Sequence, residues 1–109
     1  MQYNTILSSI DSLKTRTKLI IDRLQMVLRH MSSIAERFFT NFSSVIKILK
    51  RCRREVYNLS RKAKYDVWSW SLRYFDLIIT NLETKIYISE AKQYIAILLY
   101  GFKKLYRQL

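Results

Sequence analysis

An apolar side chain recurs every three or four residues through the first half of the chain, and this spacing limits what the chain can fold into. The series is Ile6, Ile10, Leu13, Thr17 as its one polar member, Ile20, Leu24, Val27, Met31, Ile34, Phe38, Phe42, Val45, Leu49, Cys52, Val56 and Leu59. An α-helix makes one turn in about 3.6 residues, so these side chains share one helical face. The chain has no proline and only Gly101 to form tight turns. The sequence therefore predicts an all-α fold.

Three breaks are expected in this pattern, because a long helix with one apolar face must fold back to bury that face. Ser33, with Glu36 three residues later, forms a capping box that satisfies free amide groups at a helix start. Ser60 is a weaker candidate cap. Ser89 is preferred as the third cap, because the apolar face continues across the alternative at Thr80. These breaks predict helices over residues 4–31, 34–57, 61–86 and 90–108.

Four helices joined by short connections predict an antiparallel up-down four-helix bundle, which we expect to form a single domain over residues 1–109. No window is long and apolar enough to predict a membrane span. Asp11 and Asp22 interrupt the N-terminal region, so no signal peptide is expected. Cys52 is the only cysteine, which excludes an intrachain disulfide and favours a reducing, cytoplasmic location.

The stretch from Lys47 to Lys64 is strongly basic and holds seven of the chain's twelve net positive charges. Its cations are Lys47, Lys50, Arg51, Arg53, Arg54, Arg61, Lys62 and Lys64, with Glu55 as the one acid. On a helix, Leu49, Cys52 and Val56 share one face and most of the cations lie opposite. Like charges along one stripe repel each other, so a polyanion is the expected partner. The eight cations are predicted to contact the phosphates of nucleic acid.

Such binding would depend on phosphate charge and not on base sequence. Six to eight neutralised phosphates predict a slope of log affinity against log salt of about −5 to −7. Tyr57 and Tyr65 lie beside the cations at helical spacing and are candidates for stacking on unpaired bases. Trp68 follows the same spacing but is expected in the core.

The last two predicted helices carry apolar side chains on a second face, which a four-helix monomer would leave exposed. These residues are Val67, Trp70, Tyr74, Leu77, Ile78, Ile97 and Tyr100. Further copies of the chain would cover them, so the sequence predicts a homo-oligomer with these residues at its interface.

Catalysis is not expected. His30 is the only histidine, and the eight acidic residues are spread over the predicted helices, so no nucleophile and base can be assembled. His30 near a helix end is typical of a dipole partner. Cys52, on the apolar face, is typical of a small core residue. The sequence predicts a non-enzymatic protein with no cofactor and no metal.

The second half of the chain resembles a known family. The residues that carry the likeness are Leu72-Arg73, Ile88-Ser89, Tyr94 and Leu98-Leu99-Tyr100-Gly101-Phe102 followed by Lys103 and Lys104. They are similar to the four-helix proteins related to the 23S rRNA intervening-sequence protein, and above all to the accessory variability proteins of diversity-generating retroelements. The first half departs from the family pattern, with Met31-Ser32-Ser33 where the family has a Phe-Pro motif.

The resemblance implies a homopentameric barrel without activity of its own, which binds a reverse transcriptase and its template RNA. Together with the basic stretch, it predicts an accessory protein that oligomerises and binds RNA or DNA non-specifically. Two alternatives stay open at this point. One is a helical small subunit of a CRISPR effector complex, stacked along a filament. The other is a structural or interaction protein of viral or membrane-surface type, whose basic amphipathic helix meets anionic lipid.

Overall fold

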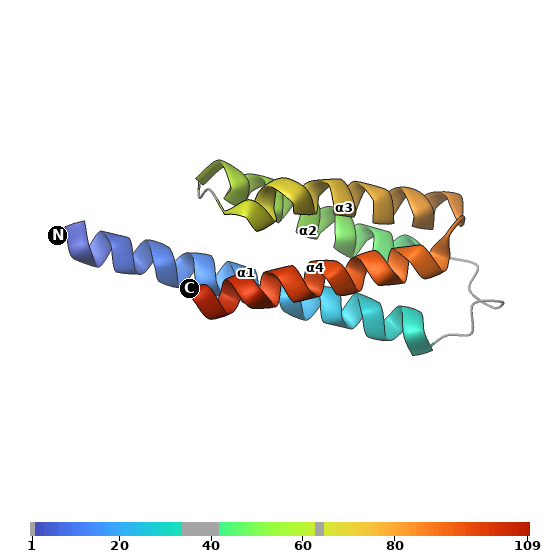
Figure 1. Ribbon diagram of the computed structural model, residues 1–109, viewed down its shortest axis with the longest axis horizontal. Helices are drawn as coiled ribbons and strands as arrows, with labels where there is room; N and C mark the ends of the chain where they lie inside the picture. The colour runs from blue at the N-terminus through green and yellow to red at the C-terminus, as the bar shows by residue number, and fades with distance from the viewer. Residues whose placement is uncertain (1, 34–41, 63–64) are drawn as a thin grey trace.

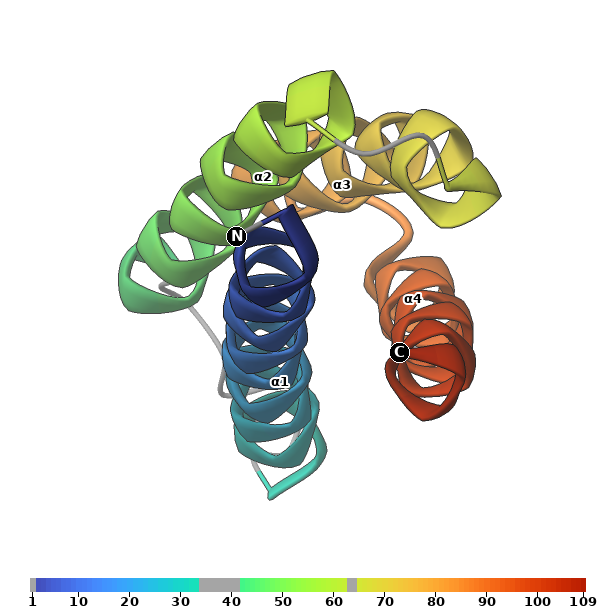
Figure 2. The same ribbon diagram turned by 90° about the vertical axis from the view of Figure 1, so that its left-hand side faces the viewer.

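The computed structural model describes residues 2–33, 42–62 and 65–109, and within them it contains four α-helices (Figure 1). They are α1 (Gln2–Ser33), α2 (Ser43–Lys62), α3 (Asp66–Thr84) and α4 (Ile88–Gln108). Successive helices run in opposite directions (Figure 1). Packing between helices is cyclic, since α1 contacts α2, α2 contacts α3, α3 contacts α4 and α4 contacts α1. The end-on view shows this arrangement (Figure 2). The predicted all-α, up-down four-helix bundle is confirmed.

The core is built from the helical faces that the apolar spacing predicts. Its buried side chains include Ile20, Leu24, Val27 and Met31 of α1, Val45, Leu49, Cys52, Val56 and Leu59 of α2, and Ile95, Leu98 and Phe102 of α4. Trp68 of α3 is 1% exposed, as expected, and its ring lies 5.5 Å from that of Phe102. Thr17 is also buried, and its hydroxyl donates a hydrogen bond to the Leu13 carbonyl at 2.7 Å. This bond satisfies the polar group and lets Thr17 take a core position.

The apolar series does not stay buried to its N-terminal end. Ile10 is 37% exposed, because the first part of α1 extends beyond the ends of the other three helices (Figure 1). Spacing alone predicts the face of a helix, but the length over which that face is covered depends on the neighbouring helices.

The predicted break at Ser60 is wrong. α2 continues through this residue to Lys62, and the Ser60 hydroxyl donates to the Tyr57 carbonyl at 2.7 Å inside the helix. A serine hydroxyl that donates to a carbonyl of its own helix is satisfied locally and does not cap the start of another helix. Arg61 and Lys62 therefore extend the basic helix and do not begin the next one. The predicted start of the second helix at residue 34 is also wrong, because α2 begins at Ser43 and Phe42 before it is not helical. Ser33 is the last residue of α1, and Glu36, its partner in the predicted capping box, lies outside the described residues.

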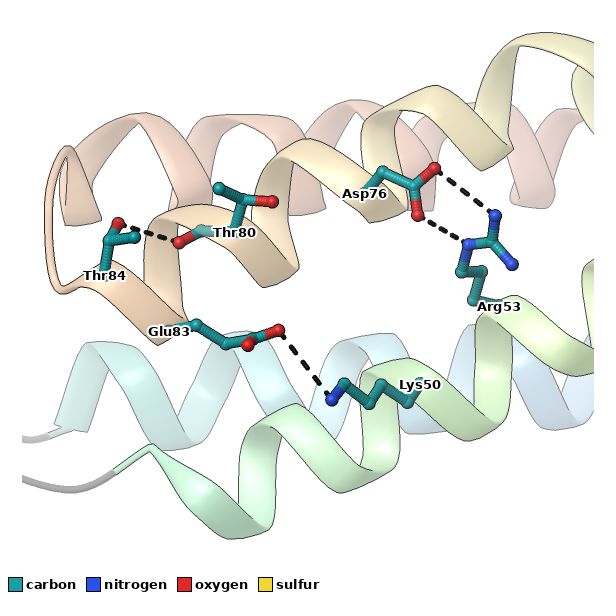
Figure 3. Close-up of polar contacts among 6 residues, drawn as sticks. All are labelled: Lys50, Arg53, Asp76, Thr80, Glu83 and Thr84. Atoms are coloured by element: carbon teal, nitrogen blue, oxygen red, sulfur yellow. Dashed lines mark hydrogen bonds and ion pairs between the residues drawn. The ribbon is translucent and has the colours of Figure 1, made fainter.

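The turn between α3 and α4 also differs from the expectation. The residue before α4 is Tyr87, with φ of 58°, so Ser89 lies within the first turn and is not the cap. Lys85 has φ of 59°, and its amide and that of Ile86 both donate to the Asn81 carbonyl. The left-handed backbone at Lys85 ends α3. α4 then begins after Tyr87, and no side chain caps its start. The helix is continuous across Thr80, as predicted, and the Thr84 hydroxyl donates to the Thr80 carbonyl at 2.8 Å (Figure 3).

Replacing Lys85 by glycine should stabilise the protein. A side chain in left-handed backbone costs about 1 kcal/mol, which glycine avoids. Lys85→Gly should raise the free energy of unfolding by about 1 kcal/mol and Tm by several degrees. Lys103→Gly, inside α4, is the control and should lower stability by about the same amount. Urea and thermal denaturation measure both. Equal losses in the two variants would contradict the turn geometry.

Candidate nucleic-acid interface

The outer face of α2 carries a fixed stripe of cations. Five side chains of this helix are buried on the opposite face, from Val45 to Leu59, and they set how the helix is rotated in the bundle. Lys47, Arg51 and Arg54 consequently point to solvent and are exposed, as the sequence predicted. None of the three takes part in an ion pair with the residues that the structure describes. They form the part of the stripe that is open to a partner.

Two other cations of α2 are paired with carboxylates of α3. The Arg53 guanidinium donates to both oxygens of Asp76, at 2.6 Å from Nε and 3.3 Å from Nη2, and this hydrogen bond raises the pKa of Arg53 (Figure 3). The Nζ of Lys50 lies 3.8 Å from a carboxylate oxygen of Glu83. All four side chains are at least 39% exposed. Pairs this exposed contribute about 0–1 kcal/mol, so a polyanion could compete for both cations.

The stripe continues to the C-terminal end of α2. Arg61 and Lys62 are exposed there, and Tyr57, 47% exposed, lies one turn from both Arg54 and Arg61. Tyr65, the residue before α3, is 38% exposed. Both predicted stacking tyrosines are therefore accessible beside the basic helix. Lys64 lies outside the described residues.

Cys52 lies on the buried face of α2, as expected, and packs toward Arg23 of α1. Burial raises the pKa of its thiol to about 11, although the nearby Arg23 guanidinium acts in the opposite direction. The thiol is thus neutral and shielded at physiological pH, which is the state of a core residue and not of a nucleophile.

The structure buries two of the seven residues that were predicted to form the oligomer interface and leaves the other five at least partly exposed. Val67 and Ile78 are 7% and 0% exposed, so placing them on a second, outer face was wrong. α3 packs against α2 on one side and α4 on the other, and its buried face is therefore wider than a single stripe. The other five predicted residues do reach the surface. Trp70 and Tyr74 are half-buried, and Leu77, Ile97 and Tyr100 are 41%, 42% and 71% exposed.

These five residues line a shallow groove between α3 and α4, which also contains Tyr94, Arg73 and Lys104. The last three were not singled out as site residues from the sequence. The signal for Tyr94 and Lys104 was helical spacing, because Tyr94, Ile97, Gly101 and Lys104 follow one another at three and four residues along α4. Arg73 lies at the same spacing from Trp70 and Leu77 along α3.

Comparison of the chain with protein-family models, curated proteins and solved structures found no match. None of the described helices combines the length and the apolar character that crossing a membrane requires. Among the described residues, no group of three His, Cys, Asp or Glu side chains is placed to hold a metal ion.

The buried thiol should make stability depend on pH in the alkaline range. Its pKa is raised from 9.0 to about 11, so the folded state keeps a proton that the unfolded chain releases. The resulting stability is fully present below pH 9 and is lost as the pH rises toward 11. The free energy of unfolding should therefore fall by on the order of 2 kcal/mol more than that of Cys52→Ala between pH 8 and pH 11. Urea denaturation at a series of pH values measures this difference, and parallel profiles for the two proteins would contradict it.

Proposed function

We propose that this chain is a non-enzymatic accessory protein that holds nucleic acid on the outer face of α2. One observation carries the proposal: Lys47, Arg51 and Arg54 are exposed on one side of a helix whose other side is locked into the core. The backbone of this stripe is pre-organised by the core, so binding a polyanion requires ordering of the side chains but no movement of the helix.

The phosphate backbone is the part of nucleic acid that such a surface contacts. Lys47 to Arg54 covers about 10 Å of helix, and Arg61 and Lys62 extend the stripe by two further turns. Each neutralised phosphate releases condensed counterions, which favours binding at low salt and is independent of sequence. Lys50 and Arg53 can add to the contacts if the polyanion displaces Glu83 and Asp76.

A reverse transcriptase of a diversity-generating retroelement is the protein partner that we propose. Its support is the resemblance of residues 61–108 to the accessory variability proteins, together with the basic face on α2. In this role the protein would hold template RNA near the polymerase without acting on it. Self-association, which the resemblance also implies, stays a prediction.

Reversing the charge of the open cations should abolish binding without unfolding the bundle. The triple variant Lys47→Glu, Arg51→Glu and Arg54→Glu removes three phosphate contacts and adds three repulsive charges. Affinity for a fluorescent oligonucleotide should fall on the order of 100-fold or more at about 0.1 M salt. The matched control is Arg29→Glu, Lys85→Glu and Arg107→Glu, three exposed cations on α1, the α3–α4 turn and α4. The control changes the net charge by the same amount. An equal loss of affinity in both variants would show that binding depends on the net charge of the protein and not on the position of the α2 cations.

Releasing Arg53 from its partner should strengthen binding. Asp76→Asn removes a carboxylate beside the stripe and leaves the Arg53 guanidinium open to phosphate. We expect affinity to rise about threefold at low salt, and the salt slope to steepen by about one. Asp22→Asn is the control, since Asp22 also pairs an exposed cation, Lys18 at 2.7 Å, but lies on α1. Fluorescence anisotropy over a salt series measures the affinity and the salt slope of each variant. An equal effect of the two substitutions would show that the nucleic acid does not lie beside Arg53.

A further inference from the structure

The groove between α3 and α4 consists of two hollows on either side of Trp70. The first, of about 450 Å³, lies between Tyr65, Trp70, Ile97, Tyr100 and Lys104. The second, of about 590 Å³, is lined by Trp70, Arg73, Tyr74, Leu77 and Tyr94. We call this surface the α3–α4 groove. Its lining holds the rings of five aromatic residues, Tyr65, Trp70, Tyr74, Tyr94 and Tyr100, and the cations Arg73 and Lys104. Trp70, Tyr74 and Tyr94 pack against the core on one side, whereas Tyr100 is 71% exposed.

Gly101 sets the position of Trp70 at the centre of the groove. A Cβ on Gly101 would lie 2.6 Å from Cη2 of Trp70, so only glycine lets the indole rest against α4. The Trp70 and Tyr74 rings meet edge to face with centroids 5.4 Å apart, and Tyr74 meets Tyr94 in the same way at 5.5 Å. Edge-to-face contacts of this kind hold the rings in place. The groove is therefore a formed surface and not a set of loose side chains.

We propose that the α3–α4 groove stacks unpaired bases of a single strand whose phosphates lie on α2. The inference rests on the proposed function and narrows it, because it makes single-stranded nucleic acid the preferred ligand. Every base offers a π-face to an aromatic ring, but in a duplex that face is covered by neighbouring base pairs. The groove would give this preference without reading sequence.

The position of the groove supports this occupant. The first hollow is lined by Tyr65 and Trp70 at the start of α3, and the open cations Arg61 and Lys62 end α2 at the same end of the bundle (Figure 1). Tyr65 follows Lys62 by three residues. A strand lying along the basic stripe can therefore pass over this end and enter the groove.

Charge favours a nucleic acid over a second copy of the chain. Arg73 and Lys104 lie in the groove, and among the residues that the structure describes Asp66 is the one acid that lines either hollow. Each copy carries a net charge of +12, so two copies meeting at this face would bring like charges together. A single strand instead supplies bases that can stack on the rings of the groove and negative charge that can pair with its cations.

The test compares oligo-dT with an abasic oligonucleotide of the same length, which has the same phosphates and no bases. We expect the full-length protein to bind oligo-dT about tenfold more tightly than the abasic strand. Oligo-dT should also quench the emission of Trp70, whereas Trp68 is buried in the core. Tyr100→Ala, at the most exposed ring, should remove most of the difference between the two strands. Tyr87→Ala is the control, because Tyr87 is 64% exposed in the α3–α4 turn, outside the groove.

Each other outcome has a distinct meaning. Equal affinity for the two strands would overturn base stacking and leave the phosphate-binding function standing. Failure to bind either strand would overturn both proposals. Light scattering is run on the same samples, and an oligomer that Tyr100→Ala dissociates, while oligo-dT affinity is unchanged, would show that a second copy occupies the groove.

Discussion

Burial of one face of α2 against its neighbours determines most of what the protein presents to solvent. Leu49, Cys52 and Val56 are 0% exposed, and because they cannot leave the core without loss of stability, they fix the rotation of the helix. That rotation aims Lys47, Arg51 and Arg54 outward along one line. Repulsion among these cations opposes the helix, and the buried contacts offset it. The binding surface is thus a consequence of core packing.

α3 connects the basic face to the aromatic one. Toward α2 it supplies Asp76 and Glu83, which neutralise Arg53 and Lys50 and confine the open charge to the outermost part of α2. Toward α4 it supplies Trp70 and Tyr74, whose rings line the α3–α4 groove. A helix that packs on both sides has a wide buried face, which is why Val67 and Ile78 are core residues although they lie off its main apolar stripe.

The sequence predicted the features that depend on a single helix. Helical spacing identified the buried faces of α1 and α2 and the outward direction of the α2 cations, because both follow from chain geometry. It did not predict that Arg53 faces Asp76, since this depends on how two helices align. The end of α2 was also missed, because the Ser60 hydroxyl can bond within a helix as readily as it can cap one. The contact of Gly101 with Trp70 likewise required the structure.

The central claim is that the cations on the outer face of α2 neutralise phosphates, and the salt dependence of binding by the unmodified protein tests it most directly. Five exposed cations, Lys47, Arg51, Arg54, Arg61 and Lys62, are available, and Lys50 and Arg53 can join them. With five to seven phosphates of a single strand neutralised, log affinity should fall with log salt at a slope of about −3.5 to −5. A slope between zero and about −1 would contradict the account, because binding would then release almost no counterions.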